Sequence, residues 1–338
     1  MKAVYPILET KWISKFLLSV AEKGALGVNF FFVLSGFLIT YLILNEVKST
    51  GQFSLRKFLI RRTLRIWPLY FIIVLIGFVI FPAIFSDYET VHNPWIYIAF
   101  LANFDEISVG LNDSINFLTS PWSVAVEEQF YLFWGLLMFT LYRLKMLKLP
   151  IVIAILYLLT FIFRWQYWNY ERDIYYHTFA VSQDILTGSF IAWSLFEGKK
   201  WLDKIRDLKV FWVILIYAAG FLLCITKNKV FADEMVIFER FFLSLFFGFI
   251  ILDQIRGKHS IYKMGKIKIF NYLGKISYGL YMYHLVIFYV IFRWMTSWNE
   301  HGYWLAGLYF VMCLVLTIAV SSLSYYLIEK PLLKMKPK

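Results

Sequence analysis

Pro121-Trp122-Ser123-Val124-Ala125-Val126-Glu127-Glu128-Gln129-Phe130-Tyr131 opens a segment that continues through apolar residues to Leu141. Ser120 before the proline predicts a helix start here, because a hydroxyl caps free N–H groups and proline is tolerated at the first helical position. The adjacent carboxylates of Glu127 and Glu128 then lie about two turns inside an apolar helix. Ionised groups at such a depth in a membrane cost a few kcal/mol and normally face a polar cavity. The stretch therefore predicts a membrane-spanning helix that lines a polar cavity.

The composition agrees with a membrane location. The 338 residues are 60% hydrophobic and 21% aromatic, with a mean hydropathy of +0.65, whereas soluble domains are about half apolar. The apolar segments are long and continuous, which favours spanning helices over a barrel of alternating strands. We predict an all-α, polytopic integral membrane helix bundle of about nine transmembrane helices that forms a single domain over residues 1–338.

The spans follow an interfacial or extracytoplasmic segment expected at residues 1–24, and the bundle occupies residues 25–338. We expect the spans at about 25–44, 66–85, 121–142, 149–163, 178–196, 210–225, 236–254, 276–292 and 303–328.

Charge gives the spans an orientation. The net charge is +12, and most of the 34 Lys and Arg fall in connections that alternate onto one side. The connection at 86–120 holds acidic residues but no Lys or Arg. By the positive-inside rule the basic side is cytoplasmic, so we expect a multi-pass protein of the cytoplasmic (inner) membrane. Topology thus accounts for the positive charge, and we expect no nucleic-acid partner.

The two cysteines predict no metal site or disulfide. Cys224 and Cys313 lie in apolar helical stretches without C-x-x-C spacing or partnering histidines. We interpret both as core packing residues, and we expect no bound metal and no tightly bound cofactor.

A basic cluster precedes the second span. Arg61 and Arg65 share one helix face at i and i+4, with Arg62 beside them, so the guanidinium groups are placed to bind phosphates in bidentate fashion. The positive-inside rule alone would also place arginines at this position. Both interpretations stay open on the residues alone.

A polar stripe marks the span at 276–292. Ser277, Tyr281 and His284 share one face at i, i+4 and i+7. Intramembrane ionisable residues are candidates for function, so His284 is a candidate catalytic residue. The alternative is a histidine that hydrogen-bonds a neighbouring helix for packing.

The remaining acidic candidates each have a structural alternative. Glu127 and Glu128 point about 100° apart, so one is expected to orient an acceptor hydroxyl while the other pairs with an arginine or with the aromatic-rich interface. A salt bridge for both is the alternative. Asp184 opens the span at 178–196 within a polar group, and it is also able to pair with Arg240 inside the bundle.

No nucleophile elbow is present. Ser35 lies in Leu34-Ser35-Gly36 rather than in a G-x-S-x-G sequence. The sequence therefore gives no support to an acyl-serine intermediate, and direct transfer with a histidine accepting the proton is the simpler chemistry.

Five ordered segments resemble the acyltransferase 3 family, whose members are membrane O-acyltransferases of bacterial surface and secreted glycans. The resemblance extends from residue 27 to residue 331, and the order of the segments makes it specific. The segments are Gly27–Ile39 (GVNFFFVLSGFLI), Arg61–Tyr70 (RRTLRIWPLY), Trp122–Tyr131 (WSVAVEEQFY), Leu273–His284 (LGKISYGLYMYH) and Tyr325–Pro331 (YYLIEKP).

The resemblance implies a donor and further site residues. The Arg62-x-x-Arg65 pair matches a motif associated with the acyl donor, which implies acyl-CoA, with acetyl-CoA expected. Glu329 matches the terminal Glu-Lys-Pro motif, although a helix cap or ion pair is its alternative role. Asp184 resembles a family position more weakly. Further candidates within or near the motifs are Ser35, Trp122, Ser123, Ser277 and Tyr281.

The chain departs from the family at its start. Family members ordinarily have one more spanning helix before the Gly27 segment, which carries an arginine and a histidine regarded as the catalytic base. Residues 1–24 contain neither residue type. We expect either a start-site truncation of a complete enzyme or a natural form without that base.

These observations predict an acyltransferase that modifies polysaccharide by O-acetylation. It would move an acyl group, acetyl by preference, from acyl-CoA to a hydroxyl of a cell-surface or secreted carbohydrate. Two alternatives remain open. One is a transporter or flippase of a lipid-linked sugar that uses the same polar groups as a path. The other is an inactive family member that supports another membrane enzyme.

Overall fold

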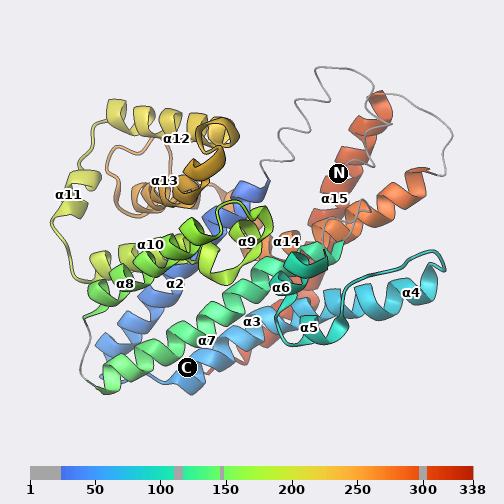
Figure 1. Cartoon of the computed structure of the whole chain (residues 1–338), viewed down its shortest axis with the longest axis horizontal. Helices are drawn as coiled ribbons and strands as arrows, with labels where there is room; N and C mark the ends of the chain where they lie inside the picture. Colours follow the sequence, from blue (N-terminus) through green and yellow to red (C-terminus); the bar gives the residue numbers. More distant parts are fainter. Residues whose placement is uncertain (1–23, 110–116, 145–147, 297–302, 338) are drawn as a thin grey trace. The chain divides into compact units, whose positions relative to one another are not determined.

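A computed structural model describes residues 24–109, 117–144, 148–296 and 303–337, and every regular element in them is a helix (Figure 1). The segment expected at residues 1–24 lies outside the described residues except for Gly24. The all-α prediction is confirmed for the described residues.

Long helices make up most of the structure. They are α2 (Ala25–Thr50), α3 (Leu55–Leu75), α7 (Pro121–Arg143), α8 (Leu149–Gln166), α10 (Thr178–Phe196), α12 (Val210–Val230), α13 (Val236–Arg256), α14 (Lys268–Thr296) and α15 (Tyr303–Ser324). The short helices are α4 (Phe81–Ile84), α5 (Pro94–Ile98), α6 (Ala102–Val109), α9 (Glu171–Tyr176), α11 (Trp201–Arg206) and α16 (Lys330–Lys334).

Two of the long helices run on through π-helical turns. The turn Ile76–Ile80 joins α3 to α4, and the turn Tyr325–Glu329 joins α15 to α16. A π turn inserts one residue into the helical repeat and is found often at functional positions.

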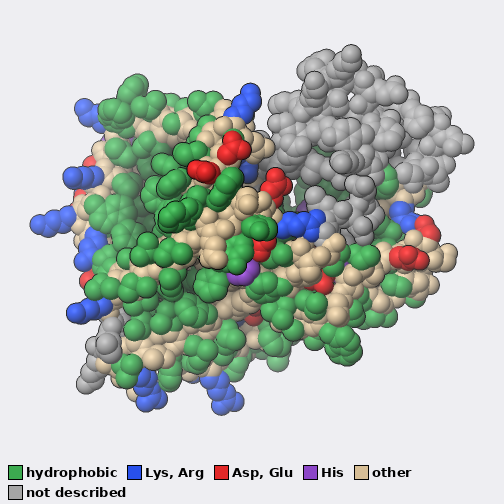
Figure 2. All heavy atoms as spheres, in the orientation of Figure 1, with side chains coloured by type: hydrophobic (Ala, Val, Ile, Leu, Met, Phe, Trp, Pro, Cys, Tyr) green, Lys and Arg blue, Asp and Glu red, His purple; other side chains and the backbone are tan. Residues whose placement is uncertain are grey.

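Eight helical segments of the described chain are long and apolar enough to cross a membrane, which confirms the polytopic prediction. The ninth expected span, at 178–196, is the helix α10, which lies outside those eight and buries most of its side chains. Hydrophobic side chains cover much of the described surface in the view of Figure 2. The eight segments are Leu26–Thr50, Leu55–Ile84, Phe117–Arg143, Leu149–Gln166, Val210–Val230, Asp233–Arg256, Lys268–Trp294 and Gly307–Lys334.

The chain divides into two compact units whose segments alternate along the sequence. The first unit takes its described residues from Leu59–Glu128 and Ile269–Lys338. The second unit takes them from Ala21–Phe58 and Gln129–Lys268. The single domain expected from the sequence stays a prediction, and each unit is described by itself below.

The second unit is built on a close approach of α2 and α10. A Cβ atom on Gly36 would lie 1.9 Å from the carbonyl oxygen of Ile185, and one on Gly188 would lie 1.9 Å from that of Val33. Ser189 adds a hydrogen bond from its hydroxyl to the Gly36 carbonyl at 3.3 Å. Small residues allow the two backbones to approach this closely. The resulting dispersion contacts hold the helices together, because the hydrophobic effect does not drive helix association in lipid.

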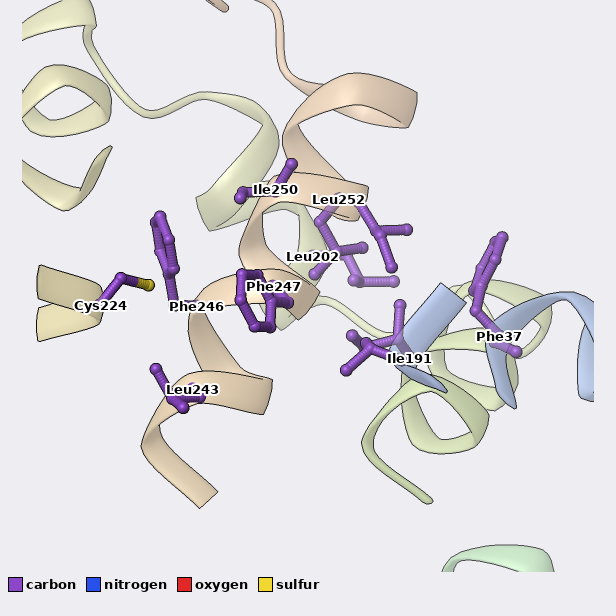
Figure 3. Packing of buried hydrophobic residues seen from close by; sticks show 12 residues of the cluster. Phe37, Ile191, Leu202, Cys224, Leu243, Phe246, Phe247, Ile250 and Leu252 are labelled. Atoms are coloured by element: carbon purple, nitrogen blue, oxygen red, sulfur yellow. The ribbon is translucent and has the colours of Figure 1, made fainter. Parts of the chain in front are cut away.

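A hydrophobic cluster surrounds this helix pair in the second unit (Figure 3). Phe37 of α2 and Ile191 of α10 contribute from the pair, and Phe246 and Phe247 contribute from α13. Cys224 of α12 packs in the same cluster, and Cys313 is also buried, in agreement with the prediction that both cysteines are core packing residues.

The first unit joins α14 to α15 through small and hydroxylated residues. A Cβ atom on Gly279 would lie 3.1 Å from the Cβ of Ser321. The hydroxyl groups of Tyr283 and Ser324 are 3.1 Å apart, and Tyr272 donates to Ser322 at 2.7 Å. Backbone contact and hydroxyl pairs thus replace large apolar side chains at this helix interface.

Gly36→Ala is expected to destabilise the second unit by about 1–3 kcal/mol, because the added methyl group would meet a backbone carbonyl that is unable to move aside. The measurement is the thermal unfolding midpoint of the purified chain in detergent. Gly27→Ala is the matched control in the same helix, since a Cβ there meets nothing within 4 Å and alanine favours a helix. Equal midpoints for the two variants would contradict the close packing of α2 on α10.

Candidate active site

The basic cluster lies on α3 in the first unit, where Arg61 and Arg62 are half-buried and Arg65 is exposed. Lys336, two residues beyond α16, belongs to the same electrostatic neighbourhood. Burial and the positive charges of the three arginines lower the pKa of Lys336 to about 8. Four cations from two distant parts of the sequence therefore gather in one region of the unit.

Glu128 connects this cluster to the start of α7. Its carboxylate accepts a hydrogen bond from the indole Nε1 of Trp67 at 3.0 Å and lies within electrostatic reach of Arg62. Trp67 is one and a half turns beyond Arg62 on α3. The neighbouring Glu127 is offset from Glu128 by about 100° around the helix, and it is only 2% exposed.

Tyr278 of α14 lies among three carboxylates. It is buried, and its hydroxyl donates to the carbonyl oxygen of Ile66 at 2.8 Å. Glu127, Glu128 and Glu329 all act electrostatically on its ring hydroxyl. Glu329, from the π turn after α15, also lies within electrostatic reach of Arg65. Three carboxylates from two different helical segments are therefore gathered near one buried tyrosine, and one of them also lies near an arginine.

A hydroxyl network lies at the start of α7. Tyr281 donates to the carbonyl oxygen of Ser120 at 3.0 Å, so its oxygen accepts from the hydroxyl of Ser123 at 2.7 Å. Trp122, next to Ser123, is buried. On α14, Nδ1 of His284 lies 2.5 Å from the carbonyl oxygen of Tyr281. The bond requires a proton on Nδ1, which leaves the lone pair of the neutral ring on Nε2.

The predicted polar stripe on α14 is only partly present. Tyr281 and His284 are connected as described, but Ser277 is exposed and bonds the Gly274 carbonyl of its own helix at 3.0 Å. The buried residue at this level is Tyr278, one position further along and about 100° around the helix. Tyr278 was missed because helical spacing from His284 selects Ser277.

Ser35 and Asp184 lie in the second unit. The hydroxyl of Ser35 is 2.5 Å from that of Tyr131. Asp184 is fully buried and pairs through Oδ2 with Arg240 at 2.5 Å and with the side-chain amide of Asn29 at 3.0 Å. The structural alternative stated for Asp184, an ion pair with Arg240, is therefore present.

A buried cluster around His92 was not predicted from the sequence. Nδ1 of His92 pairs with Asp105, and its Nε2 lies 3.9 Å from Oε1 of Glu106. All three side chains are buried, and burial raises the pKa of Glu106. A signal existed: residues 86–120 contain acidic residues, one histidine and no Lys or Arg, so His92 is the one imidazole in that segment able to pair with a buried carboxylate.

In the part of the chain that the structure describes, no group of three or more His, Cys, Asp or Glu is arranged to hold a metal ion. What the first unit does offer is a cation cluster, three carboxylates and a hydroxyl network on α3, α7, α14 and the turn after α15. This set of groups suits phosphate binding and proton transfer.

Comparison with known proteins defines the class. A sequence model of the acyltransferase domain matches residues 9–326, and the chain belongs to this acyltransferase 3 family. The O-acetyltransferase OatA of Staphylococcus aureus (strain NCTC 8325 / PS 47) is 28% identical to this chain over an alignment 342 positions long. The alignment covers 97% of this chain and 54% of OatA.

A second relative leads to the same class. SACOL0978 of Staphylococcus aureus (strain COL), which has a provisional O-acetyltransferase name, is 28% identical over 92% of this chain and 53% of its own length. The chain thus spans about half the length of these curated relatives. No solved structure matches the chain.

Arg240→Met is expected to destabilise the second unit by about 3–5 kcal/mol, because it leaves the buried Asp184 carboxylate without its charge partner. The double variant Asp184→Leu/Arg240→Met should recover much of that loss, since it removes both buried charges. Thermal unfolding of the detergent-solubilised chain measures both effects.

Arg206→Gln is the control for loss of an arginine. Its partners Asp203 and Asp207 are exposed, and surface pairs contribute at most about 1 kcal/mol. Equal destabilisation by Arg206→Gln and Arg240→Met would show that the buried ion pair contributes no more to the free energy of unfolding than an exposed one.

Proposed function

We propose that the chain transfers an acyl group, acetyl in the first instance, from acyl-CoA to a hydroxyl of a cell-surface or secreted carbohydrate in the cytoplasmic membrane. The observation that carries the proposal is the arrangement of the first unit, where Glu128 bonds Trp67 and lies within reach of Arg62. A guanidinium group, which suits a phosphate, and a half-buried carboxylate therefore lie on neighbouring helices.

The donor end of the proposed site is the basic cluster. Guanidinium groups bind phosphate oxygens through paired hydrogen bonds, so Arg62 and Arg65 suit the phosphates of coenzyme A. The connection that contains them is rich in Lys and Arg, and the positive-inside rule places it in the cytoplasm, where acyl-CoA is made. This assignment also supports a location in the cytoplasmic membrane.

The acceptor end is the hydroxyl network at the start of α7. Ser123 and Tyr281 offer hydroxyl groups that suit a sugar, and Glu127 lies one turn further along α7 from Ser123. A carboxylate at this position can accept a hydrogen bond from an acceptor hydroxyl and orient it. The relatives' O-acetyltransferase names support an oxygen acceptor and an acetyl group.

The reaction is a direct transfer. The acceptor oxygen attacks the thioester carbonyl carbon, so an oxygen–carbon bond forms and the carbon–sulfur bond breaks. His284 takes the hydroxyl proton on Nε2, which is free to act as a base because Nδ1–H is held by the Tyr281 carbonyl. The thiolate of coenzyme A leaves with the electron pair and is then protonated.

Coenzyme A is expected to bind the purified chain, and the variant Arg62→Ala/Arg65→Ala should bind it at least about tenfold more weakly, because each lost charge-assisted hydrogen bond is worth about 1.5–3 kcal/mol. Titration calorimetry in detergent measures the affinity. Arg56→Ala is the matched control, since Arg56 is an exposed arginine of the same helix. Absence of coenzyme A binding to the unmodified chain would refute the donor and favour a transporter of a lipid-linked sugar.

Acetyl transfer from labelled acetyl-CoA to membrane or secreted carbohydrate is expected to fall at least about a hundredfold in Glu127→Gln and in His284→Ala, because each variant removes a group that handles the acceptor proton. Both variants should insert into membranes and bind coenzyme A like the unmodified chain. Undiminished transfer in both would remove these residues from the mechanism. An unmodified chain that binds coenzyme A and transfers nothing would identify the inactive-member alternative.

A further inference from the structure

The connection between α4 and α7 runs back along the helix that α3 and α4 form (Figure 1). It begins near the end of that helix opposite the basic cluster, where the ring centroids of Tyr88 and Phe81 are 5.7 Å apart. Further along the connection, the ring centroid of Tyr97 lies 5.2 Å from that of Phe78. The contact partners on the helix therefore move towards its basic end as the connection proceeds.

Phe100, between α5 and α6, marks the innermost point of this path. Its ring stacks on Tyr70 with centroids 4.3 Å apart, and it lies 5.3 Å from the ring of Trp67. The chain then returns, because Phe117 contacts Phe81 at 4.8 Å, where the connection began. The helices α5 and α6 are therefore the two arms of a hairpin with Phe100 at its tip, called the α5–α6 hairpin below.

The tip of the hairpin lies deep relative to the apolar span beside it. Tyr70 precedes the end of the span Leu55–Ile84 by about 14 residues, which is about 21 Å along a helix axis. The hydrocarbon core of a bilayer is about 30 Å thick. A hairpin that enters at the outer end of this span therefore reaches the middle region of the membrane.

The backbone of the tip suits surroundings without water. The N–H groups of Ala99, Phe100 and Leu101 bond carbonyl oxygens of α5 at 2.9 to 3.1 Å. The Tyr70 hydroxyl donates to the Tyr97 carbonyl at 2.8 Å. Phe100 turns the chain with a φ of 55°, which is unfavourable for a bulky residue and persists only where packing fixes it. Backbone groups at membrane depth require such partners within the protein.

The side chains of the hairpin are distributed inside out for a protein in water. Asp105 and Glu106 of α6 are 3% and 7% exposed and lie against His92. Trp95 is 74% exposed, and Phe104 is exposed as well. In water the carboxylates would lie outside and the aromatic rings inside. Lipid favours the reverse distribution, because hydrocarbon accommodates apolar side chains and excludes charges.

We propose that the α5–α6 hairpin is re-entrant: it enters the membrane from the side opposite the basic connections and presents Trp95, Ile98 and Phe104 to lipid acyl chains. Lipid is favoured over a protein partner because this exposed face lies at the depth of an apolar span. The whole connection also lacks Lys and Arg, whose charges would be costly to bring into the bilayer. The tip contacts Trp67, whose indole donates to Glu128, so the hairpin borders the candidate active site.

The test uses the full chain in vesicles of phosphatidylcholine and phosphatidylglycerol. Ile98→Cys and Phe104→Cys place a thiol on the lipid-facing surface, and Glu89→Cys is the matched control at an exposed residue of the same connection. A membrane-impermeant maleimide should label the first two at least about tenfold more slowly than the control, because apolar surroundings raise the pKa of a thiol and lower its thiolate fraction. The unmodified chain, whose Cys224 and Cys313 are buried, gives the background.

A second measurement identifies what covers these thiols. Each variant is labelled in detergent with a small fluorophore and reconstituted into the same lipids with bromine on their acyl chains. Bromine should quench most of the fluorescence of the labels at positions 98 and 104 and little of that at position 89. Aqueous iodide should quench only the label at position 89.

The other outcomes contradict the proposal. Iodide quenching at positions 98 and 104 would place the hairpin in water outside the membrane. Quenching by neither reagent would show that protein covers this face, either a second copy or another segment of the chain. Trp95→Cys, at the most exposed of the three positions, replaces either variant whose thermal unfolding midpoint falls below that of the unmodified chain. No donor or acceptor takes part, so the result is independent of the proposed acyl transfer.

Discussion

A charge inside an apolar helix bundle has to find its partner within the protein, and this constraint shapes both units. In the second unit Asp184 meets Arg240 and Asn29, and the fully buried Arg164 donates to backbone carbonyls, including those of Ile237 and Ala180. Such pairs are costly to break because the group left behind stays buried. In the second unit the polar contacts therefore tie helices together.

The first unit meets the same constraint with different partners. Glu128 accepts a hydrogen bond from the indole of Trp67, and Glu329 lies within electrostatic reach of Arg65. These contacts join α3, α7 and the turn after α15 within the first unit, which holds most of the candidate site residues.

Much of the fold could be predicted from the sequence, because the hydropathy of each segment indicates whether lipid or water surrounds it. The spans, the start of α7 at Pro121 and the grouping of the arginines on α3 all follow from local pattern. Tyr278 could not be selected, because helical spacing relates only residues of one face and the partners of that face belong to other helices. The association of Lys336 with the arginines of α3 could not be predicted either, because these residues lie far apart in the sequence.

The His92 cluster shows a second limit. Burial of Asp105 and Glu106 on the short helix α6 is set by tertiary packing, whereas acidic residues are ordinarily solvated. The charge inventory of residues 86–120 held the necessary information, but only once burial was known.

The π turn at Tyr325–Glu329 sets the phase of the last helix. One inserted residue rotates everything after it by about 100° relative to an uninterrupted α-helix. The serines of α15 that bond α14 and the buried Glu329 at the end of the turn therefore belong to two different helical registers. The helix has two requirements, and the turn separates them. The part before the turn packs against α14, while the part after it keeps the register that buries the carboxylate of Glu329. A single-residue deletion within the turn would merge the two registers and force one requirement to yield to the other.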